Sequence, residues 1–345
     1  MTAIRSAEVL SVEGEGSRTE LRIMDGPLAG EEHPGIFYPE LGAPPEVGGV
    51  VLANTVGVEM RLGTGGVAFI LPGGGGDAPE NDGHFVKLPY TPVQFPAASP
   101  ASGAESLAGV PVVVLPLHSH LPVACAAAAN VRPGRRVAFV WREGGALPVS
   151  FSRSVSELEE KNLLHVVVSS GNCFGGDIET VNEYSALLSA ADSGVDLILA
   201  GIGPGVAGTG VRYAHGGMSA ASSLNAAASL GAEPILAPRI SFADGRERHF
   251  GLSHHTRSVL EAALAGCRVA IPEGADVSLD GLPERHEYVP VAFGAGGLED
   301  DFRLTFESMG RRYTDDECFF DAAAAAVWLA LGEDAESGTG GGDSG

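Results

Sequence analysis

The chain has 345 residues, which is long for a single hydrophobic core, so two domains are expected. Hydrophobic residues make up 44% of it and charged residues 19%, a composition typical of globular proteins. The formal net charge of -23 argues against nucleic acid and against an anionic membrane as partners, while leaving room for a local basic pocket that holds a small anion.

The first 96 residues are expected to form a small β-barrel-like domain. Short runs bounded by glycine, proline and aspartate turns predict strands, and no helical period occurs before residue 100. The expected strands are "IRSAEVLSV" (4–12), "TELRIM" (19–24), "GGVVLANTV" (48–56) and "GVAFILP" (66–72). Residues 97–109 are small, polar and proline-bearing, which is typical of a linker.

Residues 110–332 alternate continuous apolar runs with stretches of helical spacing. Continuous apolar runs favour strands that are covered on both faces, as in a parallel sheet. The expected strands are "VPVVVLP" (110–116), "RVAFVW" (136–141), "LHVVVSS" (164–170), "DLILAG" (196–201), "EPILAP" (233–238) and "CRVAIP" (267–272). The expected helices between them are 154–164, 177–191, 218–231 and 253–266. This repeated βα unit predicts an open, mostly parallel, doubly wound α/β sheet.

The C-terminal part is expected to hold one more helix and a disordered tail. The last helix should begin at "TDDE", where Thr314 and Glu317 have the spacing of a capping box. Residues 333–345 have too little apolar content to fold and are expected to be disordered.

Several features predict a cytoplasmic protein. The 4 cysteines form no CxxC pair, which favours a reducing compartment. The N-terminal "MTAIRSAEVLSVEG" has no basic region followed by an apolar one, so no signal peptide is expected. The alanine-rich "FDAAAAAVWLAL" is too short to span a bilayer.

The loops after the predicted strands are the expected place for a ligand. In open α/β sheets, ligands bind beyond the carboxyl ends of the strands. The loops at those ends are rich in glycine, histidine and polar residues, whereas the opposite loops are plain connectors. These loops are "LHSHLP", "REGGALP", "SSGNCFGGD", "GIGPGVAGTG" and "RISFADGRERHFGLSHHT".

Histidines supply the candidate bases and metal ligands. His118 and His120 have i, i+2 spacing, which in an extended segment would turn both side chains toward one metal ion. Ser253 is a natural N-cap, so His254 and His255 should lie in the first helical turn, where the helix dipole favours neutral imidazoles. The alternative for the first pair is one ring bonded to a backbone carbonyl and one in water. For the second pair it is one ring that caps the turn and one in water.

Two further residues come from the loop "SSGNCFGGD". Asp177 is expected to cap the helix that follows, and a role as a general base or metal ligand is the sharper alternative. Asn172 lies in the same loop and is a candidate ligand-binding residue.

The motif "GPGVAG" (203–208) formally matches GxGxxG after a strand. No helical period opens within it, and the next strand ends in Arg239 rather than an acid, so NAD(P) is not expected. A loop for a generic anion or phosphate is the better interpretation, with Gly203, Gly205, Gly208 and Thr209 as its candidate residues.

Arginines are the best candidates for holding the anion, because guanidinium groups match phosphate and carboxylate bidentately. The candidates in the segment after the fifth strand are Arg239, Ser241, Arg246, Arg248 and His249. The alternative is that these arginines form ion pairs with Asp244, Glu247 and the acidic surface.

Several long stretches together resemble a known family. They are "NTVGVEMRLGTGG", "GHFVKLPYTPVQ", "GNCFGGDIETVNEYS", "GPGVAGTG", "PRISFADGRERHFGLSHHT" and "ESMGRRYTDDECFF". From about residue 50 to 330 they are similar to an uncharacterised bacterial family, domain of unknown function 3866. The resemblance implies no reaction or ligand. The family pattern has one histidine in the first loop, matching His118, and differs at His120.

The sequence therefore predicts a protein that binds a small anionic metabolite at the carboxyl edge of its sheet, with phosphorylated metabolites as one option. If it is an enzyme, hydrolysis or group transfer is expected, with a divalent metal left open as a cofactor. The alternatives are a non-catalytic sensing protein and an interaction protein that uses its β-domain. An oligomer is left open by the sequence.

Overall fold

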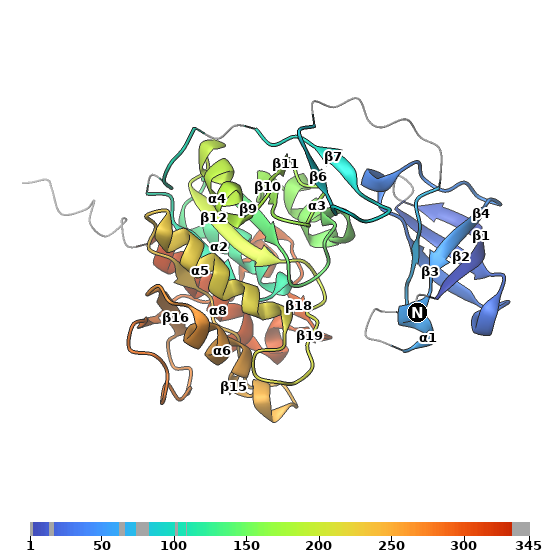
Figure 1. Cartoon of the computed structure of the whole chain (residues 1–345). Coiled ribbons are helices and arrows are strands. Elements are labelled where there is room, and N and C mark those ends of the chain that lie inside the picture. The colour runs from blue at the N-terminus through green and yellow to red at the C-terminus, as the bar shows by residue number, and fades with distance from the viewer. Residues whose placement is uncertain are drawn as a thin grey trace, which may run out of the picture. The chain divides into compact units, whose positions relative to one another are not determined.

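The computed structural model describes residues 3–13, 17–61, 66–73, 83–100, 103–107 and 109–332. The tail at 333–345, predicted to be disordered, lies outside the described residues. The chain divides into two compact units, residues 1–98 and 99–345 (Figure 1). Among the helices of the described ranges, none is both long enough and apolar enough to cross a membrane.

The first unit contains a closed five-stranded barrel in the order β1-β2-β3-β5-β4, which confirms the predicted barrel. Its strands are β1 (Ile4–Glu13), β2 (Arg18–Ile23), β3 (Glu32–Ile36), β4 (Val50–Asn54) and β5 (Ala68–Ile70). Neighbouring strands are antiparallel except for β3 and β5. Alternate residues such as Ala7, Val9, Leu21 and Ile23 fill the interior, as the two-residue period of a strand requires.

Strand β3 was not predicted, because its sequence "EHPGI" reads as a turn. Gly35 lies in it because a Cβ there would overlap the side chains of Thr19 and Leu21. The unit also contains α1 (Val56–Glu59), the 3-10 helices η1 (Gly26–Leu28) and η2 (Pro39–Leu41), and a ribbon of β6 (Phe85–Lys87) and β7 (Phe95–Ala97).

The second unit is built on an eight-stranded sheet in the order β11-β10-β9-β12-β8-β13-β16-β17. Every neighbouring pair is parallel. The six predicted runs form β8 (Val112–Leu115), β9 (Val137–Arg142), β10 (Val166–Ser169), β12 (Leu197–Ile202), β13 (Ile235–Leu236) and β16 (Arg268–Pro272). The two edge strands, β11 (Ile178–Glu179) and β17 (Glu287–Val291), were not predicted. Residues 178–179 fall inside the helix expected at 177–191, and Pro290 argues against a strand at 287–291.

Helices cover both faces of this sheet, which confirms the doubly wound α/β fold (Figure 1). One face packs against α2 (Leu121–Val131), α3 (Arg153–Glu160), α7 (Leu298–Phe302) and α8 (Glu317–Leu331). The other packs against α4 (Glu183–Asp192), α5 (Ser219–Ser229) and α6 (His254–Ala262). Along β8, Val113 and Leu115 join the first core while Val112 and Val114 join the second, so the strand is apolar throughout.

Helix boundaries differ from the prediction in two places. Asp177 does not cap a helix, because residues 178–179 extend the sheet as β11 and α4 begins only after Asn182, whose side chain accepts a hydrogen bond from the Ser185 N–H. The last helix begins at Glu317 rather than at Thr314, because residues 313–315 form a 3-10 turn and Asp316 takes the N-cap position.

Several short elements lie beyond the carboxyl edge of the sheet. Two antiparallel pairs occur there, β14 (Ile240–Ser241) with β15 (Gly251–Leu252), and β18 (Glu307–Ser308) with β19 (Arg311–Arg312). The 3-10 helices of this unit are η3 (His118–His120), η4 (Val149–Phe151), η5 (Gly216–Met218), η6 (Glu247–His249) and η7 (Tyr313–Asp315).

The strand order creates a crevice at the centre of the sheet. Strand β12 lies directly between β9 and β8. The chain leaves β8 toward α2 on one face and leaves β12 toward α5 on the other. Where neighbouring strands send their helices to opposite faces, a crevice opens beyond their carboxyl ends, and such crevices hold ligands in open α/β sheets.

Candidate functional site

A cavity of about 530 Å³ lies at this crevice, at the carboxyl ends of β8, β12 and β13. Its volume is within the range of small-molecule sites. Its wall comes from the loop after β8, the glycine loop after β12, the segment after β13, the β18–β19 hairpin and the start of α3. The predicted site residues in the wall are His118, Gly203, Gly205, Gly208, Arg239, Arg246, Arg248, His249 and His255.

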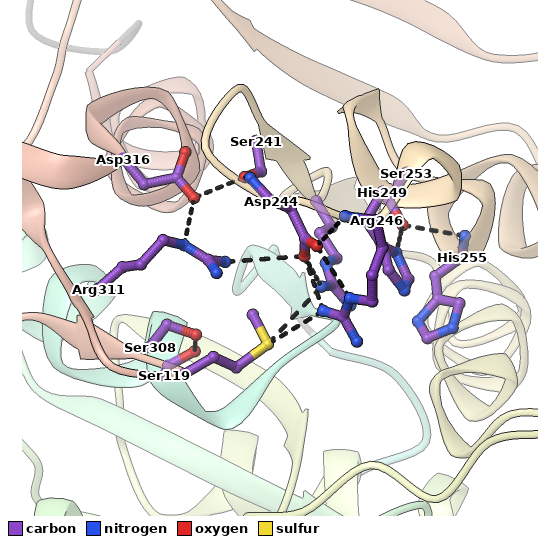
Figure 2. A network of polar contacts seen from close by, with 12 residues as sticks. Ser119, Ser241, Asp244, Arg246, His249, Ser253, His255, Ser308, Arg311 and Asp316 are labelled. Carbon is purple, nitrogen blue, oxygen red and sulfur yellow. Dashed lines mark hydrogen bonds and ion pairs between the residues drawn. The ribbon is translucent and has the colours of Figure 1, made fainter.

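The centre of the site is the buried carboxylate of Asp244, which binds three guanidinium groups. Its Oδ2 lies 3.0 Å from Arg239 Nη2, 2.7 Å from Arg246 Nη2 and 3.7 Å from Arg311 Nη2 (Figure 2). Hydrogen bonding from Arg246 is the largest cause that holds the pKa of Asp244 well below its usual range. Arg311 also donates from Nε to Asp316 at 3.1 Å. Three cations thus share two carboxylates, which leaves an excess of positive charge.

Some of the donors in this cluster are not engaged by the described part of the protein. The Nε of Arg239 is buried and has no hydrogen-bond partner among the described residues. Burial lowers the pKa of Arg239 to about 10, so this side chain stays charged at neutral pH. Arg248 is exposed at the rim and makes no hydrogen bond or ion pair with the part of the chain that the structure describes. The ion pairs to Asp244 that the sequence offered as an alternative are therefore present. They leave some N–H groups of the arginines without a partner among the described residues.

Ser241 supports the cluster from behind and does not line the cavity. Its hydroxyl donates to Asp316 at 2.6 Å and accepts from the Asp244 N–H at 3.0 Å (Figure 2). This bond fixes the turn that carries Asp244. Thr209 is also outside the cavity wall, and its N–H donates to the Ala214 carbonyl at 3.0 Å.

The β18–β19 hairpin forms a wall that was not predicted. Its two-residue turn, Met309 and Gly310, has positive φ at both positions (53° and 75°), the requirement of a type I′ turn. The turn places the Met309 sulfur 3.4 Å from Arg246 Nη2 and 3.9 Å from Arg239 Nη2. Beside it, the Ser119 hydroxyl donates to Ser308 at 3.0 Å. The signal for this turn was Met-Gly between two short polar runs in "ESMGRRYT".

The glycine loop after β12 is held close to the sheet by its backbone. A Cβ on Gly203 would overlap the Trp141 ring and the Ala146 carbonyl, so only glycine fits. Gly205 has a φ of 79°, which glycine adopts without strain. The next helix, α5, begins at Ser219, outside the 203–208 motif. The backbone N–H groups of such a loop can approach an anion closely.

His118 lies in the cavity wall with both ring nitrogens engaged. Its Nδ1 is 3.1 Å from the Ile202 carbonyl and therefore donates, and its Nε2 accepts from the Ser152 hydroxyl at 2.7 Å. Burial lowers the pKa of His118 to about 4, so the ring is neutral at physiological pH. The ring thus links the carboxyl end of β12 to the start of α3, where Ser152 is the N-cap.

The geometry expected for a shared metal on His118 and His120 is not present. Residues 118–120 form a 3-10 turn rather than an extended segment, because the chain turns directly from β8 into α2. At about 120° per residue, positions i and i+2 of such a turn point to different sides. His120 is fully buried in the core, with its ring 4.5 Å from that of Phe319, and burial lowers its pKa to about 3.

Four histidines gather beside the arginines. The rings of His249, His254 and His255 have centroids between 4.4 and 4.9 Å apart, and His215 stacks on His255 at 3.7 Å. Ser253 caps α6 as predicted, accepting from the His255 N–H at 3.2 Å. Burial is the main cause that lowers the pKa of all four rings, and nearby cations lower it further.

His215 was missed because it lies in a loop far from the others in sequence. His254 faces a second, shallower cavity beside Phe242 and Phe250 rather than the main one. Asp177 and Asn172 are outside both cavities. The Asp177 carboxylate accepts from the Val167 N–H at 2.8 Å, and the Asn172 N–H donates to Glu143 at 2.9 Å.

Comparisons with known proteins give one match. A search of curated proteins and a search of solved structures found none. The model of a family described as "Protein of unknown function (DUF3866)" matches residues 34–327, a range that includes every residue of the cavity wall. The chain therefore belongs to the DUF3866 family of proteins of unknown function.

Proposed function

We propose that this protein binds a small anionic metabolite, of the phosphorylated class, in the cavity at the carboxyl edge of its Rossmann-like sheet. The observation that carries the proposal is the arginine cluster around Asp244, which concentrates positive charge at the central crevice of a chain with a net charge of -23. A strongly acidic protein gains no general attraction for anions, so such a cluster is best explained by a local ligand.

Asp244 acts as an anchor that preorganises the cations. Its two oxygens fix Arg246 through Nε and Nη2, at 2.9 and 2.7 Å, and hold Arg239 through Nη2. A guanidinium group held in this way keeps other N–H groups for a second anion. Little side-chain entropy is then lost when the ligand binds. The donors of Arg239, Arg246 and Arg248 that Asp244 does not occupy, together with the amides of the glycine loop, supply the contacts.

Hydrolysis or group transfer is the reaction class that this wall would support. The neutral rings of His118 and His255 lie in it. Their pKa values, lowered to about 4 and about 2, are below the range near 7 that suits a general base. Neutral imidazoles of this kind suit coordination or hydrogen bonding to a ligand better than proton abstraction. Of the two rings, His255 is the one for that role, because both ring nitrogens of His118 already contact Ile202 and Ser152.

The proposal is tested by calorimetric titration with inorganic phosphate, pyrophosphate and a panel of phosphorylated sugars and nucleotides. We expect saturable binding of at least one of them, weakened about tenfold by Arg246→Ala or Arg248→Ala, because each removes a charge-assisted hydrogen bond. Arg136→Ala is the matched control, since this exposed arginine precedes β9 at the opposite edge of the sheet. Binding that is absent throughout, or equally weakened by Arg136→Ala, would contradict the proposal.

A further inference from the structure

We propose that His249, His254 and His255 form a binding site for one transition-metal ion of the zinc class, next to the anion cavity. One ring nitrogen from each lies within 4.8 Å of the others. Three nitrogens on a tetrahedral zinc ion lie about 3.3 Å apart, so small rotations of the rings complete the site. The role of the ion toward the anion rests on the proposed function, whereas the metal site itself does not.

The local sequence holds the three rings together. His249 ends the 3-10 turn η6, and the other two open α6, so four residues of chain bring the rings to one place. Ser253 organises the turn: its hydroxyl lies 2.7 Å from His249 Nδ1 and accepts from the His255 N–H (Figure 2). This contact occupies one nitrogen of His249 and leaves Nε2 for an ion, which is the usual way in which a second contact orients a metal-bound histidine.

An unpaired ring nitrogen of His254 supports a metal ion at this place. The Nε2 of His254 is buried and has no hydrogen-bond partner among the described residues. A buried polar atom without a partner costs about 1–3 kcal/mol, and a bound ion would remove that cost. The His215 ring stacks on the ring of His255, the third proposed ligand, at an interplanar angle of 10°. This contact limits the rotation of the His255 ring.

The surrounding charges fit an ion that carries an anion. Imidazole binds zinc through an unprotonated ring nitrogen, and each of the three rings offers one. Arg239, Arg246 and Arg248 disfavour a bare dication, and an anion bound to them would offset that repulsion. Three neutral ligands leave a fourth position open on zinc. His249 and His255 line the anion cavity, so that position can be reached by a bound anion.

The test uses tag-free, full-length protein, stripped with a chelator and titrated with Co²⁺ and then with Zn²⁺ against a chromophoric chelator. We expect one ion per chain, an intense visible Co²⁺ spectrum of the tetrahedral type, and its loss when Zn²⁺ is added. His249→Gln and His254→Gln should each weaken metal binding by about 100-fold or more. His33→Gln is the matched control, because this histidine belongs to the barrel and pairs with Glu31.

Far-UV circular dichroism of each variant shows whether the fold is retained. If His249→Gln fails to fold, the His254→Gln variant, whose ring makes no ring-nitrogen hydrogen bond through Nε2, provides the test. No stoichiometric ion, or equal affinity in the histidine variants and in His33→Gln, would overturn the site. Phosphate binding without any metal would leave the proposed function standing and remove this inference, and metal binding without phosphate would do the reverse.

Discussion

The imidazole ring of His215 lies parallel to the ring of His255, with centroids 3.7 Å apart and an interplanar angle of 10°. Burial is the largest cause that lowers the pKa of each ring, and the charge that His215 would carry lowers the pKa of His255 further. The stack is therefore an arrangement of neutral rings. Protonation of either ring would place a cation beside the arginines around Asp244.

Stability should fall as the solution becomes acidic, beginning near pH 6.5. An unfolded histidine binds a proton near that pH, whereas His255 and His249 have pKa values lowered to about 2 and about 3. The unfolded chain then binds more protons than the folded one, so the contribution is complete above pH 6.5 and is lost as the pH falls toward the folded values. Each such histidine contributes a slope of up to about 1.4 kcal/mol per pH unit.

The measurement is the free energy of unfolding in urea at pH 8, 6 and 5, with a chelator present. In His255→Gln the decline between pH 6 and 5 should be shallower than in the original chain, because one depressed site is gone. His33→Gln should keep the original slope. An identical slope in all three proteins would show that the His255 ring titrates normally in the folded state.

Replacing the central carboxylate should cost far more stability than removing an outer arginine. Asp244→Asn leaves Arg239, only 3% exposed, without its ionic partner, and breaking a buried pair in this way costs about 3–5 kcal/mol. Arg246→Ala should cost about 1 kcal/mol, since its side chain is 45% exposed. Glu233→Gln, at an exposed position before β13, should change stability by less than about 0.5 kcal/mol. Urea denaturation gives all three values, and equal losses for Asp244→Asn and Arg246→Ala would contradict the anchor role.

The two ends of the glycine motif should respond differently to a methyl group. Gly203→Ala should lower the free energy of unfolding by about 1–3 kcal/mol, because its Cβ would overlap the buried Trp141 ring and a carbonyl. Gly208→Ala should cost less than about 1 kcal/mol, since the nearest atom is His215 Cβ at 3.3 Å. Thermal and urea unfolding of the two variants make the comparison. Similar losses at both positions would mean that the loop packs differently from this description.

The sequence predicted those elements whose burial leaves a simple pattern. The strands of the sheet centre are apolar without interruption because both faces are covered, so each was visible as a run. Helix α2 was not predicted, because residues 121–128 are all buried and an alanine-rich helix apolar on every side has no amphipathic period. The sequence pattern assigns residues 178–179 to a helix, whereas they form β11, because a strand of two residues is too short to show a period of its own.

The sequence predicted the location of the site at the carboxyl edge of the sheet, but only some of the residues that form it. The rule that ligands bind at the carboxyl edge located the histidines and arginines of the segment after β13. It gave no means of placing Met309, which reaches the same cavity from about seventy residues further along the chain, or Arg311, which contacts Asp244. The predicted metal pair of His118 and His120 was wrong for a local reason. A two-residue spacing places two side chains on the same side only where the backbone is extended. A tight turn at a strand end breaks that rule.

The edge strand β17 has a feature that discourages pairing with a further strand. The Glu287 N–H donates to the Cys267 carbonyl, and the Val291 carbonyl accepts from the Glu273 N–H, so residues 287, 289 and 291 direct their peptide groups toward β16. Residue 290 therefore directs its peptide nitrogen outward, and proline at that position removes the donor. At the opposite edge, β11 has only two residues. One edge strand thus lacks a hydrogen-bond donor, and the other is only two residues long. Neither edge offers a good partner for a strand of another molecule, so this largely apolar sheet is protected from aggregation through its edges.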